Sequence, residues 1–320
     1  MFRWGWQKIL LSLLVVMTLI GGGCALRKPL PPGQPPGPAG REFTEEPTIS
    51  LYDNKTKQTK KIKLEEYVAG VVAAEMDTSW PVNALGAQAI LARTFTLENI
   101  KAGRVKKLYG ADISTDIEES QAYAPEKIND NVRKAVQLTR GQVIRWQGKY
   151  VKAWFHACCG GKTASAKEGL AYEKEPTPYL ATVADGCMAI TTPENKHWEV
   201  KLSGEELARA VKQATGQDPG QVTSVQIIKR GPSGRVESLK VGNVAISGPA
   251  LRLAVGSEKM RSMMLEDIQN AGGTFIFKGR GFGHGVGLCQ WGAKKMAAEG
   301  KQPWSIVKFY YKGVKIEKLW

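Results

Sequence analysis

Glu75 is the residue in this 320-residue chain whose position most clearly indicates chemistry. Apolar side chains precede it at Leu64, Val68, Val71 and Val72, the spacing of one helical face, and Glu75 continues that row. A carboxyl group among valines loses solvation of its charged form. This raises its pKa and lets it carry a proton near neutral pH as a general acid. The alternative is a glutamate at a helix end that reaches solvent or pairs with an arginine.

A second helix is expected shortly after the first, and its alanine-rich face includes Gln88, with Arg93 on the margin. Alanines allow two helices to approach closely, so we expect Gln88 and Arg93 to reach the Glu75 carboxylate. For Gln88, a hydrogen bond to the backbone is the alternative. Glu65 and Glu66 occupy the first turn of the first helix, where the helix dipole favours negative charge, and need no functional role.

Two histidines lie in glycine-rich turns at predicted strand ends, His156 in FHACCGGKT and His284 in GFGHGVGLCQWGA. Glycines let a ligand or another backbone approach closely, so both turns are candidate walls of a binding site. A nucleotide site is disfavoured because the second turn lacks the Lys-Ser/Thr pair of a phosphate-binding loop.

Four cysteines follow the N-terminal region: Cys158, Cys159, Cys187 and Cys289. His156 together with Cys158, Cys159 and Cys187 would supply the nitrogen and sulfur ligands of a tetrahedral, structural zinc site. A Cys159–Cys187 disulfide and inert buried thiols are the alternatives.

The charge balance is basic, with 45 Lys and Arg against 30 Asp and Glu, and 42% of the residues are hydrophobic. That composition indicates a globular protein with an anionic partner, such as nucleic acid, a lipid surface or a cell-wall polymer. No zinc finger or aromatic RNA-binding signature is present, so we expect no nucleic-acid partner.

The N-terminus predicts a membrane segment. Residues 9–26 form an uncharged run of roughly 27 Å if helical, long enough to anchor the chain as a single-pass protein. We expect residues 1–8 in the cytoplasm, a Pro/Gly-rich linker over residues 27–47, and an extracytoplasmic domain over residues 48–320. Cys24 follows three glycines, as in lipoprotein processing sites, so lipidation is the alternative to an uncleaved anchor.

The remaining pattern predicts an α+β fold of mixed helices and antiparallel β-hairpins. Hairpins are expected over residues 48–64 and 142–155. A strand, a helix and a further hairpin over residues 198–264 predict a smaller inserted α/β subdomain.

Several stretches together resemble the stage II sporulation protein D family, also called the amidase-enhancer domain family, over nearly all of residues 48–320. They are EEYVAGVVAAEM through ALGAQAILARTF, the loop ISTDIEESQAY, FHACCGGKT, and GRGFGHGVGLCQWGAKKMAAEGK running into IVKFYYKG. The last stretch is the most specific.

The resemblance implies a membrane-anchored lytic transglycosylase that cuts peptidoglycan strands lacking stem peptides during forespore engulfment, with Glu75 as catalytic acid. Partners implied are the glycan, the membrane, a wall amidase and a membrane scaffold. Its cysteine-rich members are described as holding zinc. The competing interpretation is a non-catalytic, wall-binding amidase enhancer, which would not need a protonated Glu75.

A lytic transglycosylase needs one acid/base and no cofactor, because the 6-hydroxyl of the sugar itself closes a 1,6-anhydro ring. Ordinary glycosidases need a second carboxylate, and Asp77, two residues on, would face another way on a helix. We expect the following residues to contact the glycan: Gln88, Arg93, Ser114, Thr115, Gln121, Tyr123, His284 and Gln290.

Overall fold

The computed structural model describes residues 42–320, so the expected anchor at residues 9–26 lies outside the described residues. None of the described helices is both long enough and apolar enough to cross a membrane. Within residues 42–320 the fold mixes helices with small, mostly antiparallel sheets, which confirms the predicted α+β class.

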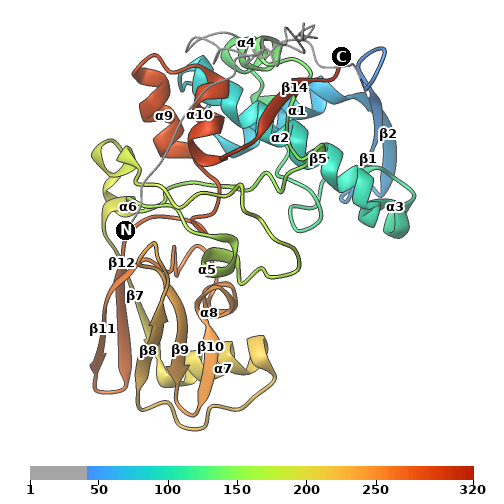
Figure 1. Ribbon diagram of the computed structural model, residues 1–320. Coiled ribbons are helices and arrows are strands. Elements are labelled where there is room, and N and C mark those ends of the chain that lie inside the picture. The colour runs from blue at the N-terminus through green and yellow to red at the C-terminus, as the bar shows by residue number, and fades with distance from the viewer. Residues whose placement is uncertain (1–41) are drawn as a thin grey trace, which may run out of the picture. The chain divides into compact units, whose positions relative to one another are not determined.

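The first lobe is a group of helices built around α2. Its helix α1 ends at Glu75, and both α1 and α2 pack against α4, while α9 and α10 from the end of the chain also pack on α2 (Figure 1). The bounds are α1 Leu64–Glu75, α2 Val82–Ala102, α3 Arg104–Tyr109, α4 Asp130–Leu138, α9 Gln290–Ala298 and α10 Pro303–Tyr310. The alanine-rich sequence of α2 allows this crowding because small side chains let several helices approach one backbone.

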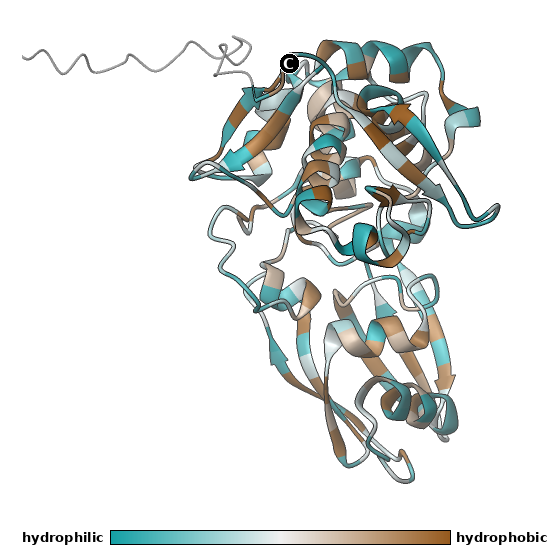
Figure 2. Ribbon diagram, turned by 90° about the vertical axis from the view of Figure 1, so that its right-hand side faces the viewer, coloured by the Kyte–Doolittle hydropathy of each residue, from teal (hydrophilic) through white to brown (hydrophobic). Residues whose placement is uncertain are grey.

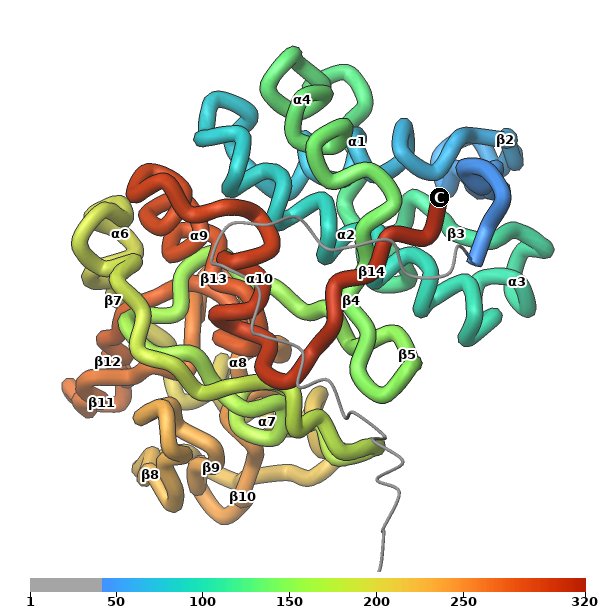
Figure 3. The backbone as a smooth tube through the Cα atoms, turned by 45° about the horizontal axis from the view of Figure 1, so that its top comes forward, coloured from blue at the N-terminus to red at the C-terminus, as the bar shows by residue number. Residues whose placement is uncertain are grey.

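Two three-stranded sheets flank these helices. In the first, β1 pairs with β2 as the expected hairpin and with β3 in parallel. In the second, the C-terminal strand β14 runs antiparallel beside β4, as Figure 3 shows, and β4 also pairs with β5. The bounds are β1 Thr48–Asp53, β2 Gln58–Lys63, β3 Ile113–Ser114, β4 Gln142–Trp146, β5 Lys149–Tyr150 and β14 Lys315–Lys318.

The segments that carry the cysteines and histidines meet in a short parallel pair. Strand β6 (Phe155–His156) pairs with β13 (Leu288–Cys289), with His156 opposite Cys289. This pairing joins two glycine-rich turns that are about 130 residues apart in sequence. Short elements connect this region: α5 Ala166–Leu170, η2 Gly186–Ala189 and α6 Pro193–Lys196, while η1 Pro125–Lys127 packs on α1 in the first lobe.

The second lobe has its own apolar core, drawn from residues between Trp198 and Phe277. One sheet has the order β11-β12-β7 and the other β10-β9-β8, with helices α7 and α8 packed together. Packing therefore continues past the expected limit at residue 264, because β12 pairs with β7 and β11 pairs with β12. The bounds are β7 Trp198–Ser203, α7 Gly204–Thr215, β8 Val225–Arg230, β9 Val236–Val241, β10 Val244–Ser247, α8 Gly248–Val255, β11 Leu265–Ala271 and β12 Thr274–Gly279.

Hydropathy follows this packing. Figure 2 shows brown and teal segments alternating along the helices and strands, as expected where one face of each element meets a core.

The folded part of the chain begins before Thr48. Phe43 stacks edge-on against Trp320, with ring centroids 5.9 Å apart, and its N–H donates to the Leu319 carbonyl. Glu46 pairs with Arg140 at 2.6 Å. The linker expected over residues 27–47 therefore ends earlier, since residues 42–47 already pack against the domain.

Candidate active site and thiol cluster

Glu75 is the last residue of α1 and is partly buried. One carboxylate oxygen, Oε1, accepts a hydrogen bond from the Ala122 N–H at 3.2 Å. Burial raises the pKa of Glu75 to about 7, and the Ala122 hydrogen bond opposes part of that shift. The negative end of the helix dipole acts in the same direction as burial. The carboxyl group can therefore hold a proton near neutral pH.

Tyr67 lies near this carboxyl group and is paired with a second tyrosine, Tyr123. Tyr67 is fully buried and stacks on Tyr123, with ring centroids 5.3 Å apart and planes 20° apart. Burial first, then the charges of Tyr123 and Glu75, raise the pKa of Tyr67 well above its ordinary value, so it stays a neutral phenol. The Tyr123 ring lies directly against α1 at Gly70, where a Cβ atom would come 2.2 Å from the ring.

Gln121 and Gln88 are buried polar side chains. Gln121 donates through Nε2 to the Thr96 hydroxyl at 3.1 Å, while its side-chain oxygen has no hydrogen-bond partner among the described residues. Both amide atoms of Gln88 and the Tyr67 hydroxyl are likewise without partners there. Among the described residues, Gln88 therefore makes neither the expected hydrogen bond to the Glu75 carboxylate nor the alternative bond to the backbone.

Arg93 does not reach Glu75. Its guanidinium is fully buried and makes a bidentate pair with Glu65, at 2.5 and 3.1 Å, and a further hydrogen bond to the Gln142 carbonyl. Two expectations are therefore wrong. Arg93 is buried in an ion pair and has no exposed surface that could contact glycan. Glu65, expected to have no role beyond the first turn of its helix, is the partner in that pair. The helix-face pattern missed this because Glu65 lies on the α1 face that meets α2.

Ser114 and Thr115 shape their own loop. The fully buried Ser114 hydroxyl donates to Glu119 at 2.7 Å, so an open glycan contact by this side chain is not supported. The half-buried Thr115 hydroxyl accepts the Asn54 N–H at 3.0 Å and fixes the β1–β2 turn.

Gln290, the first residue of α9, is tied to α1. Its Nε2 donates to the main-chain oxygen of Glu75 at 3.1 Å, and its side chain is buried. The structure therefore brings Gln290 to the backbone of the candidate acid, whereas Tyr123 and Gln121 approach it from the loop after β3.

The histidines form a pair of their own. The rings of His156 and His284 lie 5.6 Å apart, and both Nδ1 atoms are engaged by Val286, His156 with its carbonyl and His284 with its N–H. Burial lowers the pKa of His156 to about 3 and that of His284 well below its ordinary value, so both rings are neutral. His156 thus faces His284 rather than the thiols.

The thiols meet around Cys187. Its sulfur lies 3.3 Å from that of Cys159 and 3.5 Å from that of Cys158. These separations exceed the bond length of about 2.05 Å in a disulfide, and the four cysteines of the described chain are free and buried. They are close to the roughly 3.8 Å expected between sulfurs that share a tetrahedral zinc ion.

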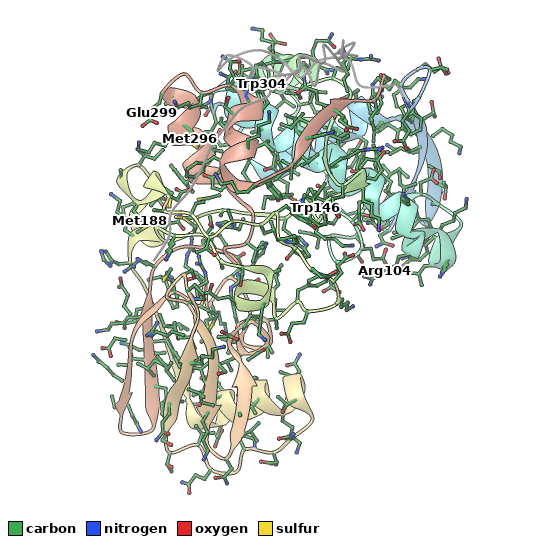
Figure 4. All side chains as sticks on the ribbon, viewed as in Figure 1. Arg104, Trp146, Met188, Met296, Glu299 and Trp304 are labelled. Atoms are coloured by element: carbon green, nitrogen blue, oxygen red, sulfur yellow. The ribbon has the colours of Figure 1, made fainter. Side chains whose placement is uncertain are left out.

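The candidate ligand set differs from the one expected. One donor atom each from Cys159, Asp185, Cys187 and Cys289 lie within 4.8 Å of one another, so these residues could hold a metal ion. Cys289 replaces His156 because β13 brings it to the Cys159 N–H, which donates to its sulfur at 3.3 Å. The turn with Cys187 also contains Met188, labelled in Figure 4.

A buried cation accompanies this cluster. Arg235, the residue before β9, donates to the carbonyls of Cys159 and Lys162 at 2.5 and 2.7 Å. Its guanidinium lies against Gly285, where a Cβ atom would come 2.3 Å from it. The second lobe therefore supplies positive charge beside the thiols, which favours the ionised, metal-binding form of Cys159, whereas burial raises the pKa of Cys289.

Comparisons with known proteins agree with this arrangement. A family model described as Stage II sporulation protein matches residues 52–146, which include α1, α2 and Glu75. A second model, a domain of unknown function (DUF8618), matches residues 190–287, the second lobe and the glycine-rich turn.

Full-length relatives extend the match. The chain is 31% identical to Stage II sporulation protein D of Bacillus amyloliquefaciens, over 85% of this chain and 79% of that protein. It is 34% identical to an uncharacterized protein of Brachyspira hyodysenteriae, over 83% of this chain and 69% of the relative. It is also 26% identical to the amidase enhancer of Bacillus subtilis, over 76% of this chain but 39% of that protein. The chain belongs to the stage II sporulation protein D family.

Proposed function

We propose that this protein is a peptidoglycan lytic transglycosylase that cleaves peptide-free glycan strands and uses Glu75 as its only acid/base. The observation that carries the proposal is the Glu75 carboxyl group, whose pKa is raised to about 7 by burial at the end of α1. The nearest acid in sequence, Asp77, is exposed, is hydrogen-bonded to Ser79, and has a lowered pKa, mainly because of those bonds. The second carboxylate of a hydrolase is also ionised, but the Asp77 carboxylate is exposed and already accepts two hydrogen bonds from Ser79 in its own turn.

The reaction needs one proton transferred twice. Protonated Glu75 donates to the glycosidic oxygen as the bond from that oxygen to C1 of the muramyl sugar breaks. The resulting carboxylate then accepts the proton of the sugar's 6-hydroxyl, whose oxygen forms a new bond to C1 and closes the 1,6-anhydro ring. No water is consumed, and Glu75 ends in its starting, protonated form. The Ala122 N–H steadies the intermediate carboxylate at 3.2 Å.

Neighbouring side chains would orient the sugar and the acid. Gln290 holds the Glu75 backbone, and Tyr123, half-buried beside it, can contact a ring of the glycan. Gln121 and Gln88 are buried as Arg93 is, so those of their amide atoms that have no partner within residues 42–320 suit ordered water, and a sugar would reach them only if the site opens. We retain His284 as a wall of the substrate region. Arg93 and Ser114 act instead by holding α1 and the loop in place.

A structural zinc ion at the thiol cluster completes the proposal. Cys159, Cys187 and Cys289 would supply three sulfurs, with the fourth ligand from Asp185 or Cys158. The ion would stabilise the turns that carry it and takes no part in proton transfer. The ion would link the turn after β6 to η2 and β13. These elements are short and form few backbone hydrogen bonds that could hold them in place.

The names of the relatives support a role in the cell wall during endospore formation, where septal wall thinning and engulfment require glycan cleavage. The uncharged run over residues 9–26 supports anchoring in the cell membrane with the domain outside the cytoplasm. A wall amidase that removes stem peptides, and a membrane scaffold, are the partners that such a role implies.

The second candidate function is a non-catalytic amidase enhancer, favoured by the match to the Bacillus subtilis protein of that name. The two functions differ in their products. The full-length chain, incubated alone with peptide-free glycan, should generate chains that end in anhydro sugars, which borohydride cannot reduce. An enhancer would leave the peptide-free glycan intact, and would act only by raising the release of stem peptides from peptide-bearing wall by an added amidase.

A further inference from the structure

Two indole rings and a lysine form a compact cluster next to the candidate acid. The rings of Trp80 and Trp291 lie 4.9 Å apart, tilted by 59°. The Lys294 ammonium lies 4.6 Å from the centroid of Trp80 and 4.5 Å from that of Trp291. Two simultaneous cation–π contacts fix a side chain that is otherwise long and mobile, and each is worth about 0.5–1 kcal/mol at a partly exposed site.

This indole–lysine cluster is positioned by the same elements as Glu75. Lys294 lies four residues after Gln290 on α9, hence one turn along the same face, and Gln290 holds the Glu75 carbonyl. Trp80 follows the end of α1 by five residues. Lys294 also helps to lower the pKa of Asp77, after the larger effect of the Ser79 hydrogen bonds. The ammonium therefore lies close to the C-terminal end of α1, where Glu75 is located.

The charge of Lys294 is not matched by a bound carboxylate. Across residues 42–320, no Asp or Glu oxygen lies within the 4.0 Å of an ion pair with it, although the adjacent Lys295 pairs with Glu299 on the same helix. Figure 4 labels Glu299 at this end of α9, beyond Met296. Asp77 lies within electrostatic range of Lys294 but forms no direct ion pair with it, so this half-buried, fixed cation can still pair with an anionic ligand.

We propose that the indole–lysine cluster is a subsite for a muramyl residue, with Lys294 pairing with its free lactyl carboxylate and an exposed part of Trp291 contacting the sugar face. The inference rests on the proposed function and names the chemistry by which that function selects its substrate. A stem peptide converts the lactyl carboxylate into an amide, which removes its charge and adds bulk. Lys294 would thus distinguish peptide-free strands from peptide-bearing ones.

Binding tests the subsite apart from catalysis. Calorimetry would use the full-length chain with Glu75→Gln, so that the glycan stays intact. The ligands would be a peptide-free muramyl oligosaccharide, the same compound with its lactyl carboxyls methyl-esterified, and a chitin oligosaccharide of equal length. Adding Lys294→Gln should weaken binding of the carboxylate ligand about tenfold, and binding of the other two hardly at all. Lys294→Arg should restore most of the affinity, and Lys295→Gln is the matched control.

Kinetics with an active Glu75 separate the two proposals. Lys294→Gln should raise KM for the peptide-free glycan with little change in kcat, and its melting temperature should match that of Lys295→Gln. If Lys294→Gln binds the carboxylate and ester ligands as its parent does, the subsite is refuted even if the parent cleaves glycan. If the parent binds the carboxylate ligand in a Lys294-dependent way but never cleaves it, the subsite stands and the lytic function fails.

Discussion

The side-chain amide of Gln290 donates to the main-chain oxygen of Glu75 at 3.1 Å, joining residues 215 positions apart. Through this contact the glycine-rich C-terminal motif and the first helix meet at the backbone of one residue, Glu75. The relationship explains why both stretches are needed for one site, although they belong to distant parts of the chain.

The raised pKa of Glu75 predicts a pH-dependent stability difference. Its folded pKa of about 7 lies above its ordinary value of 4.5, so the folded state binds the extra proton between these values. Stability is therefore lost as pH rises from about 4.5 to 7. In denaturant unfolding at pH 8, the free energy of unfolding of Glu75→Gln should exceed that of the parent by roughly 2–3 kcal/mol. Near pH 4 the two free energies should be equal. An equal difference at both pH values would show that the carboxyl group is not perturbed.

The buried pair between Arg93 and Glu65 predicts a structural effect. Arg93→Met leaves a mostly buried carboxylate without its partner and should cost about 3–5 kcal/mol in the free energy of unfolding. The double variant Arg93→Met, Glu65→Leu should recover much of that loss. Denaturant unfolding measures both. A stable Arg93→Met protein with a raised KM for glycan would instead return Arg93 to the substrate site.

The thiol cluster predicts which substitution releases zinc. Elemental analysis should find about one zinc per chain, lost in Cys289→Ser and Cys187→Ala with a lower melting temperature, and retained in His156→Gln. Cys158→Ser and Asp185→Asn then identify the fourth ligand. Zinc lost from His156→Gln and retained by Cys289→Ser would restore the ligand set expected from the sequence, and a metal-free protein unaffected by chelators would exclude both sets.

The contacts of Phe43 and Glu46 predict where the folded domain starts. Removing residues 1–40 should leave the melting temperature of the domain unchanged, whereas removing residues 1–47 exposes Trp320 and leaves Arg140 unpaired. The longer deletion should cost on the order of 1–3 kcal/mol in unfolding free energy, mostly from lost burial of the Phe43 ring. Equal melting temperatures for the two truncated chains would place the boundary at residue 48 after all.

Local sequence patterns predicted part of this structure. The three- and four-residue spacing correctly predicted that Glu75 continues a helix, and the turn signals predicted the β1–β2 and β4–β5 hairpins, because these features depend on nearby residues. The partner of Arg93 depends on how α1 crosses α2. Cys289 joins the thiols only through the pairing of β6 with β13. Residue spacing along the chain does not predict such long-range contacts. The family resemblance did include the stretch with Arg93 and the stretch with Cys289.

The central claim is that Glu75 alone moves the proton in a reaction without water. Its most direct test is mass spectrometry of the products formed from peptide-free glycan by the full-length chain and by its Glu75→Gln variant. The account predicts products one water lighter than hydrolysis products for the parent, and at least a hundredfold less product for Glu75→Gln, which keeps the shape but cannot donate the proton. Products with ordinary reducing ends, or an active Glu75→Gln protein, would contradict it.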